Sequence, residues 1–286
     1  MSIMDYNKFE GIFNKEIFEQ SKPRLLETIA NEPNRYIGLF RPTKPKGKLL
    51  QNLLQSHEIR MGNAFEVLLE EYFKISGYSI LQKNYTSEKL DIDQCFKKDD
   101  TIYFIEQKMR DDHDSSKKRG QIDNFEKKLN LMIKNYPNEK LIGIFYFIDP
   151  DLRKNENYYK SELSKMTTDY KVNLHLFYGK ELFDFMNISD IWYEILEYLK
   201  KWKDSIPDLP ELNFDLEPDQ TFNEIKDLSP AIFRKLFENP EVFNDIVLTL
   251  FPEKKTLNLL LDYFKKNSSK EIYKTLSNKL ERLLKS

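Results

Sequence analysis

The sequence predicts a mixed α/β (α+β) fold, in which helices flank a central mixed β-sheet and an all-helical region follows. Three observations predict it. An alternating stretch and an apolar stretch, separated by a short polar turn, form a hairpin within residues 89–109. Two further apolar runs of strand length, 140–148 and 171–179, are separated by helical patterns. Beyond residue 204, only short helical segments with proline or polar breaks remain.

The N-terminal part of the chain is expected to be helical. Residues 5–31 predict one or two helices, and residues 59–74 carry apolar side chains at helical spacing. Between them, RPTKPKGK (41–48) contains two prolines and a glycine and is expected to be a loop. Its cations, among them Arg41, Lys44 and Lys46, are as compatible with a phosphate-contacting arm as with a solvated connector.

The two predicted strands of the hairpin carry acidic residues at positions where alternation defines the faces. In KLDIDQCF (89–96), alternation places Leu90, Ile92 and Phe96 on one face and Asp91, Asp93 and Cys95 on the other. KKDD is the turn. In the second strand, TIYFIEQKM (101–109), Ile102, Phe104, Glu106 and Lys108 share a face. An acid and a base therefore lie on one side of an apolar strand, just where its apolar run ends.

The remaining elements alternate. A charged loop, RDDHDSSKKRGQ (110–121), precedes an amphipathic helix, and KLIGIFYFI (140–148) predicts a strand that is buried on both faces. A helix over 154–168, a strand over 171–179 and two more helices complete a predicted domain of residues 1–204. Residues 205–227, rich in proline and acid, predict a linker, and 228–286 a helical domain for dimerisation or DNA contact.

Composition excludes several classes of protein. The single cysteine, Cys95, excludes a disulfide framework and a cysteine-based zinc site within one chain. No stretch of about 18 apolar residues predicts a membrane span. The N-terminus lacks the pattern of a signal peptide, so we expect a cytoplasmic protein. The net charge of -2 neither indicates nor excludes a nucleic-acid partner.

Asp93, Glu106 and Lys108 form the pattern with the clearest chemical meaning. Two carboxylates at one end of a sheet repel each other unless a cation neutralises them, and oxygen ligands of this kind suit Mg²⁺. A neighbouring lysine would orient a water and stabilise charge on a phosphorus centre. The alternative interpretation of Glu106 and Lys108 is an ordinary ion pair at the exposed end of a strand.

This arrangement resembles the D…(D/E)xK motif of the PD-(D/E)xK nuclease superfamily, to which type II restriction endonucleases belong. The preceding helix, RMGNAFEVLLEEYF, and the following helix and apolar strand also resemble that family's core, over roughly residues 56–186. The resemblance implies a restriction-endonuclease-like core. It also implies that Asp93, Glu106 and the Gln107 carbonyl bind Mg²⁺, that Lys108 is catalytic, and that Glu66 is an auxiliary acid. Asp91 remains an alternative to Asp93.

The charged loop after the second strand is a candidate DNA contact, because it follows the proposed catalytic strand and carries cations. Consecutive acids rarely converge on one ion, so Asp111–Asp114 are not expected to bind metal. His113 is a further candidate for proton transfer. The proposed DNA-contacting residues of this loop are Arg110, Ser115, Ser116, Lys117, Lys118, Arg119 and Gln121.

The resemblance favours a type II restriction endonuclease that cuts double-stranded DNA at a short sequence with Mg²⁺. The size suits a free-standing subunit, and no Walker-type or methyltransferase glycine motif is present. Such an enzyme would act as a homodimer, with a cognate DNA methyltransferase as a genetic rather than physical partner. Two alternatives stay open, namely a structure-specific repair or recombination nuclease and a non-catalytic DNA-binding module.

Overall fold

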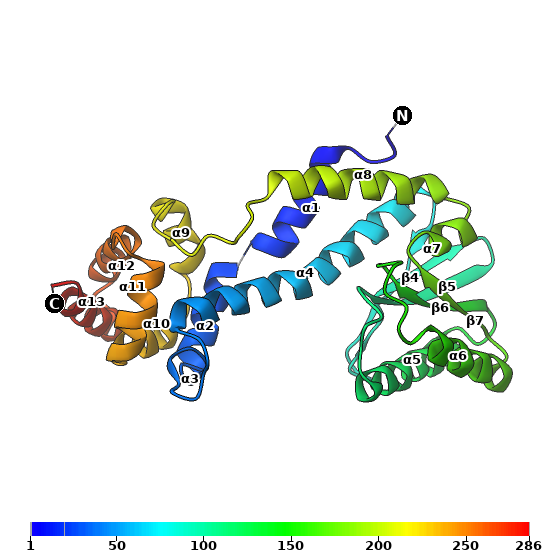
Figure 1. Cartoon of the computed structure of the whole chain (residues 1–286), viewed down its shortest axis with the longest axis horizontal. Helices are drawn as coiled ribbons and strands as arrows, with labels where there is room; N and C mark the ends of the chain where they lie inside the picture. The colour runs from blue at the N-terminus through cyan, green and yellow to red at the C-terminus, as the bar shows by residue number, and fades with distance from the viewer. Residues whose placement is uncertain (1, 20, 286) are drawn as a thin grey trace. The chain divides into compact units, whose positions relative to one another are not determined.

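The computed structural model describes residues 2–19 and 21–285. It confirms the predicted fold class, since a mixed sheet is flanked by helices (Figure 1). The strands are β1 (Ser79–Ile80), β2 (Asn84–Tyr85), β3 (Leu90–Asp91), β4 (Gln94–Lys98), β5 (Thr101–Lys108), β6 (Lys140–Phe147) and β7 (Asn173–Tyr178). Five of them form one sheet in the order β1-β4-β5-β6-β7, and β2 and β3 form a separate pair.

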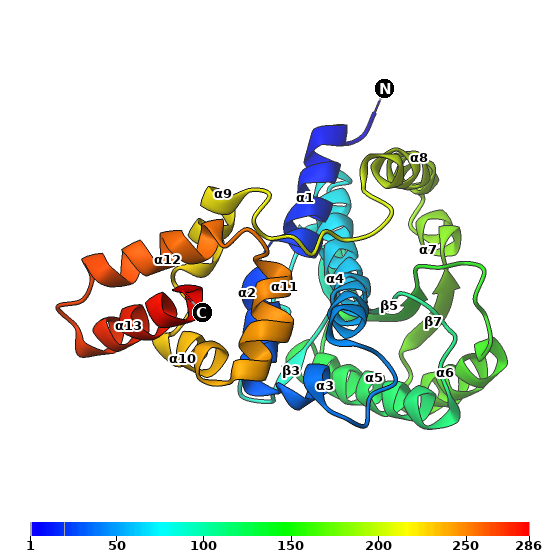
Figure 2. The same cartoon turned by 60° about the vertical axis from the view of Figure 1, so that its left-hand side comes forward.

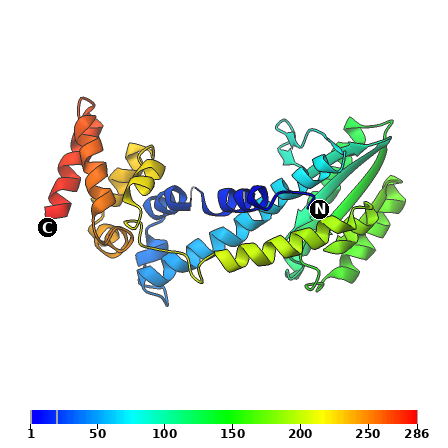
Figure 3. The ribbon, with the colours of Figure 1, turned by 90° about the horizontal axis from the view of Figure 1, so that it is seen from above.

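The sheet combines an antiparallel and a parallel half. β1, β4 and β5 pair antiparallel, whereas β5, β6 and β7 pair parallel. As expected from its apolar sequence, β6 is buried on both faces. A Cβ at Gly143, within β6, would lie 2.6 Å from side-chain atoms of both Phe104 and Leu174, so only glycine lets these neighbours pack there. The twist of the strands is visible from above in Figure 3.

Helices cover both faces of the sheet. α5 and α6 lie over one face, where Phe104 and Phe145 pack on Phe125. α4 lies over the other, where Phe73 packs on Phe96 of β4 with ring centroids 4.2 Å apart. The helices up to residue 205 are α1 (Tyr6–Phe18), α2 (Ser21–Asn31), α3 (Asn34–Ile37), α4 (Pro45–Ile75), α5 (Ser115–Asn135), α6 (Glu156–Tyr170), α7 (Lys180–Phe185) and α8 (Ser189–Ser205).

The chain divides into two compact units. One contains the chain up to Phe13 together with Met61–Ile206, and the other contains Asn14–Arg60 and the chain from Pro207 onward. The division falls within α1 and α4, so it differs from the predicted limits at 204, 227 and 228. Helices of the second unit that follow residue 207 are α9 (Pro218–Ile225), α10 (Pro230–Glu238), a π-helical turn (Val242–Val247), α11 (Leu248–Leu250), α12 (Lys255–Lys266) and α13 (Glu271–Lys285).

The second unit has its own apolar core. Leu25 and Ile29 of α2 are buried in the same cluster as Phe233 and Phe264. α12 and α13 lie side by side in Figures 2 and 3. The segment predicted as a linker contributes to this core, because Phe214 is buried there and α9 forms within it. Apolar side chains spaced between the prolines and acids therefore hold the segment against the helices.

Three local predictions were wrong in part. The predicted loop 41–48 ends early, because Pro45 takes the first position of α4, where a proline is tolerated. The predicted strand 89–96 is interrupted at Ile92 and Asp93, and Ile92 N–H instead donates to Lys83 O at 2.9 Å. Ile92 and Cys95 share the core beneath α5, while Phe96 faces α4, so the predicted faces of that strand were also wrong.

The third concerns the charged loop 110–121. Its second half belongs to α5, which begins at Ser115. The Asp114 side chain accepts a hydrogen bond from Lys117 N–H and caps the helix. None of the helices formed by residues 2–19 and 21–285 is long and apolar enough to cross a membrane.

Candidate active site

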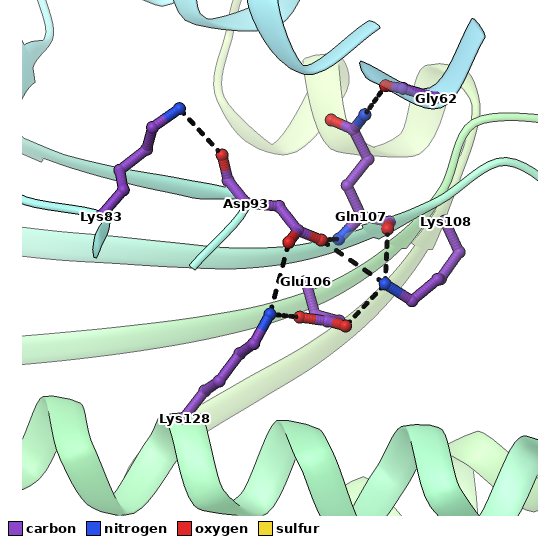
Figure 4. A network of polar contacts seen from close by, with 7 residues as sticks. All are labelled: Gly62, Lys83, Asp93, Glu106, Gln107, Lys108 and Lys128. Atoms are coloured by element: carbon purple, nitrogen blue, oxygen red, sulfur yellow. Dashed lines mark hydrogen bonds and ion pairs between the residues drawn. The ribbon is translucent and has the colours of Figure 1, made fainter. Parts of the chain in front are cut away.

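Glu106 and Lys108 lie at the end of β5, on the sheet face that α5 covers (Figure 4). The Glu106 side chain is buried, and Lys108 Nζ lies 2.6 Å from Glu106 Oε1. Lys108 Nζ also donates to the main-chain O of Gln107 at 3.0 Å. The two side chains therefore point toward the same place, as their spacing in the strand predicts.

Asp93 reaches this place from the chain just before β4. Its Oδ2 accepts a hydrogen bond from Gln107 N–H at 2.7 Å and lies 3.6 Å from Lys108 Nζ. Lys83 Nζ donates to the Asp93 main-chain O at 3.2 Å. The break in the strand at Asp93 has a physical reason, since the Asp93 side chain occupies the Gln107 N–H that a continued antiparallel ladder would use.

Lys128 of α5 completes the cluster, and sequence reasoning missed it. Its Nζ contacts Glu106 Oε2 and lies 3.3 Å from Asp93 Oδ1. Only 5% of its side chain is exposed. A signal was present, because Lys128 lies on the apolar face of its helix, three residues after Phe125 and four before Met132. A lysine at a core position needs an acidic partner.

We expect Lys128→Met to lower the free energy of unfolding by about 3 kcal/mol, since it leaves two neighbouring carboxylates with one cation. Chemical denaturation measures this difference. Lys127→Met is the matched control, because Lys127 is the exposed neighbour on the same helix. Equal stabilities of the two variants would contradict the proposed neutralising role of Lys128.

A third acid, Glu66 of α4, lies close to this cluster. Burial first, and the Asp93 carboxylate second, raise the pKa of Glu66 to about 7. The main chain at Glu66 is tied to the sheet, because the buried Gln94 donates its side-chain N–H to Glu66 O at 2.6 Å. The environment of Glu66 therefore differs from that of a solvated helix residue.

Lys108 carries a positive charge in this setting. Burial alone would lower the pKa of its ammonium group, but the Glu106 and Asp93 carboxylates raise that pKa above its ordinary value. Its ammonium group is therefore a hydrogen-bond donor and a source of positive charge at neutral pH.

The donor atoms of the cluster suit a hard cation. Among the described residues, no group of three His, Cys, Asp or Glu side chains is arranged to hold a metal ion. The donors here are two carboxylates, of Asp93 and Glu106, and the Gln107 carbonyl. All are hard oxygens, and Mg²⁺ in proteins commonly uses one or two carboxylates and shares its shell with a substrate phosphate. The donor chemistry therefore fits Mg²⁺. In this structure the ammonium groups of Lys108 and Lys128 neutralise the carboxylates.

The Gln107 side chain points to the opposite face of the sheet. Its Nε2 donates to Gly62 O of α4 at 3.5 Å, and its buried Oε1 has no hydrogen-bond partner among the described residues. Only the main chain of Gln107 therefore takes part in the cluster.

The structure separates Asp91 from this group. Asp91 is exposed in β3, where it pairs with Asn84, and none of the contacts that build the cluster from the described residues involves it. Among these two aspartates, Asp93 is the one that contacts Lys108 and Lys128.

The candidate DNA-contacting residues lie in two places. Ser115, Ser116, Lys117 and Arg119 are exposed in the first turns of α5. Three of the other candidates are already engaged. Lys118 Nζ lies 3.1 Å from Asn155 Oδ1 and above the Tyr158 ring. Arg110 also has an interaction partner, and the buried Gln121 accepts a hydrogen bond from Tyr159 OH. Arg41, Lys44 and Lys46 are exposed in the second unit.

Two acids of the charged loop have structural roles. Asp111 is fully buried and accepts hydrogen bonds from Asn155 N–H, Asn155 Nδ2 and Tyr178 OH. Asp114 is the cap of α5. His113 lies 3.3 Å from Asp112, and burial lowers its pKa. Fixed partners thus account for these acids without a metal.

Comparison with known proteins supplies independent information. The sequence matches the family described as "Type II restriction endonuclease, HinfI" over residues 5–89 and 78–203. These ranges include Glu66, Asp93, Glu106, Lys108 and Lys128. Over 55 residues, the chain is 38% identical to the UPF0102 protein VP0448 of Vibrio parahaemolyticus. That match covers 19% of this chain and 46% of the relative.

Proposed function

The chain belongs to the HinfI family of type II restriction endonucleases, and on that premise we propose that it hydrolyses double-stranded DNA at a short specific sequence with Mg²⁺. The observation that carries the proposal is the convergence of Asp93, Glu106 and Lys108 at the end of one strand pair. Two carboxylates, a lysine and a main-chain carbonyl at one point suit phosphodiester hydrolysis better than a structural ion pair.

Asp93, Glu106 and the Gln107 carbonyl would hold the ion. When bound, Mg²⁺ would neutralise the carboxylates and polarise the scissile phosphate. The Gln107 N–H already fixes the Asp93 carboxylate at 2.7 Å, so this ligand is oriented by the main chain. The Glu106 carboxylate is oriented by the strand that carries it and by Lys128.

Lys108 would act on the substrate directly. Its ammonium group can donate a hydrogen bond to the attacking water and stabilise the negative charge that develops on the phosphate oxygens. Glu66, with its raised pKa, would hold a proton near the same water. Lys128 touches both carboxylates from the helix side and acts as a positioning residue for them.

The exposed cations would contact the DNA backbone. Ser115, Ser116, Lys117 and Arg119 stand at the start of α5, where side chains and main-chain N–H groups suit phosphates. Arg41, Lys44 and Lys46 would add contacts from the second unit. Gln121 is not part of this DNA surface, because it is buried and bonded to Tyr159.

The proposal includes two partners besides DNA. A homodimer would let each subunit face one strand of a duplex site. A cognate methyltransferase would protect the host's own sites and would be a genetic partner only. The enzyme would act in the cytoplasm, where it meets unmethylated duplex DNA.

Digestion of a long unmethylated duplex with Mg²⁺ tests the function. Discrete, reproducible fragments support a site-specific endonuclease. Cleavage confined to branched junctions would instead indicate a structure-specific nuclease, and intact DNA with retained binding would indicate a non-catalytic DNA-binding module.

Removal of divalent cations should abolish cleavage, because the ion that would polarise the scissile phosphate is then absent. Chelation followed by added Mg²⁺ should restore the original rate. Mg²⁺ should also raise the melting temperature of the wild-type protein, as a ligand of the folded state does. Cleavage that persists in excess chelator would contradict the metal assignment.

A further inference from the structure

The turn between α3 and α4 displays two large apolar side chains in solvent. Phe40 is 99% exposed and Leu39 is 90% exposed. They are the most exposed large apolar side chains of the residues that the structure describes. Adjacent exposed side chains of this size favour a surface that another molecule covers.

The turn is short and firmly anchored. Arg41 N–H donates to Gly38 O at 3.2 Å, which places Leu39 and Phe40 at the two central positions of a β-turn. The anchors on either side, Tyr36 and Leu49, are buried in the core of the second unit. The main-chain path of the turn between α3 and α4 can be followed in Figure 2.

The local backbone is also constrained by sequence. A Cβ at Gly38 would lie 2.4 Å from Asn34 O, so the turn closes against α3 only with glycine there. Pro42 and Pro45 restrict the chain on the other side. The apolar pair is therefore presented in a defined direction, which lowers the entropy that binding would cost.

The charge around the turn identifies the partner. From Pro33 to His57 the sequence contains no Asp or Glu. The same stretch carries Arg41, Lys44 and Lys46, which are exposed, together with Arg35 and Lys48. Arg35, before the turn, pairs with Glu32 at 3.1 Å, so the available cations are those that follow Phe40. Cations beside an apolar tip suit a polyanion that also has an apolar interior. Duplex DNA has this combination, with phosphates outside and stacked bases inside.

We propose that Leu39 and Phe40 insert as a wedge between base steps of the DNA substrate, while Arg41, Lys44 and Lys46 bind the flanking phosphates. Insertion of apolar side chains unstacks and kinks the duplex, and flexible pyrimidine–purine steps deform most readily. The wedge would therefore add sequence preference without hydrogen bonds to bases. This inference rests on the proposed function, because it takes duplex DNA as the substrate.

The test measures unwinding of DNA in the Lys108→Ala background, which is expected to bind without cutting. Protein is bound to relaxed closed circular plasmid, a topoisomerase relaxes the complex, and the linking number is read after the protein is removed. The Lys108→Ala protein, called the parent here, should unwind the plasmid and so shift its linking number. Phe40→Ala should lose that shift and bind roughly tenfold more weakly. Phe40 is fully exposed, so this variant should fold normally.

Two further variants sharpen the test. Ile59→Ala is the matched control, because Ile59 is an exposed apolar residue of the same unit, 66% exposed, and it should change neither readout. Arg41→Gln should weaken DNA binding and reduce the slope of log affinity against log salt concentration by about one, the value for one phosphate contact. The linking-number shift should remain.

The possible failures are distinguishable. If Phe40→Ala unwinds the plasmid as the parent does, the wedge is overturned while the nuclease function stands. A change of oligomeric state in Phe40→Ala with unwinding unchanged would assign the turn to contact between copies and would also overturn it. If the parent does not bind DNA, both the wedge and the proposed function fail.

Discussion

Lys108→Ala is expected to reduce the rate of DNA cleavage at least a hundredfold while duplex binding stays nearly unchanged. The ammonium group lies 2.6 Å from Glu106 Oε1 and 3.6 Å from Asp93 Oδ2, where the phosphate would have to meet the carboxylates. Its loss removes charge stabilisation in the transition state but few ground-state contacts. Single-turnover cleavage and fluorescence anisotropy with a labelled duplex measure the two effects separately.

Lys97→Ala provides the matched control for this prediction. Lys97 is a lysine of the same sheet that pairs with Glu139 at 3.0 Å, away from the cluster, so its removal should leave the rate unchanged. Glu106 keeps its contact with Lys128 in the Lys108 variant, which should preserve the fold. A Lys108→Ala protein that cuts at the wild-type rate would show that the site has been assigned to the wrong residues.

Asp93→Asn is expected to have a comparable effect, a loss of cleavage of about a hundredfold or more. Asparagine keeps an oxygen for the Gln107 N–H but loses the negative charge that would bind Mg²⁺ and balance Lys128. The variant should also fail to gain thermal stability when Mg²⁺ is added. Cleavage rates and melting temperatures with and without Mg²⁺ measure both consequences.

Asp91→Asn is the internal comparison, two residues away on the same segment. Asp91 is exposed and pairs with Asn84 in the small sheet, so its substitution should leave the rate within about threefold, as most surface changes do. The opposite pattern, an inactive Asp91→Asn and an active Asp93→Asn, would make Asp91 the motif aspartate.

The main elements of the fold could be predicted from the sequence, because buried positions are occupied by apolar residues at the period of each element. β6 is a continuous apolar run and lies at the centre of the parallel half of the sheet. β5 ends in Glu106 and Lys108, on one face as the two-residue period requires. The hairpin places Asp93 beside them. Local periodicity was sufficient for β5 and β6, whereas Asp93 was assigned from the motif and its spacing to Glu106.

The role of Lys128 follows from its contact with Glu106, which lies 22 residues earlier in the chain. No local periodicity in the sequence predicts that contact. The body of the helix that carries Lys128 was predicted correctly, although not its start. In the sequence, Lys128 stands out only as a charged residue on the apolar face of that helix. The partner of a buried charge becomes identifiable once the helix is docked on the sheet. Tertiary pairing of this kind limits what a single sequence can predict.

The strand break at Asp93 was hidden for a similar reason. The alternation of KLDIDQCF fits a continuous strand, but the Asp93 side chain takes the N–H of Gln107 at 2.7 Å and ends the ladder. Side-chain competition for main-chain donors is common for Asp, yet its outcome depends on the neighbouring strand. The start of α5 at Ser115 shows the opposite case, because Asp114 is of a residue type that commonly caps helices, which was a local signal.

The second unit shows why domain limits were hard to place. The predicted linker is rich in proline and acid, but Leu212, Phe214 and Ile225 bury in a core that also contains residues of α2 and α4. Segments far apart in sequence therefore build one unit. Composition marks the proline-rich stretch, whereas the contacts that fold it come from residues distant in sequence, such as Leu250, whose main-chain O accepts from Phe214 N–H at 2.8 Å.

Sequencing of DNA ends after digestion tests the central claim most directly. A long unmethylated duplex would be incubated with Mg²⁺ and the wild-type protein, with Lys108→Ala as the parallel sample, and all new ends would be sequenced. A site-specific endonuclease should produce ends at one short recurring sequence, and the variant should produce none. Ends scattered without a common sequence, or equally frequent in both samples, would contradict it.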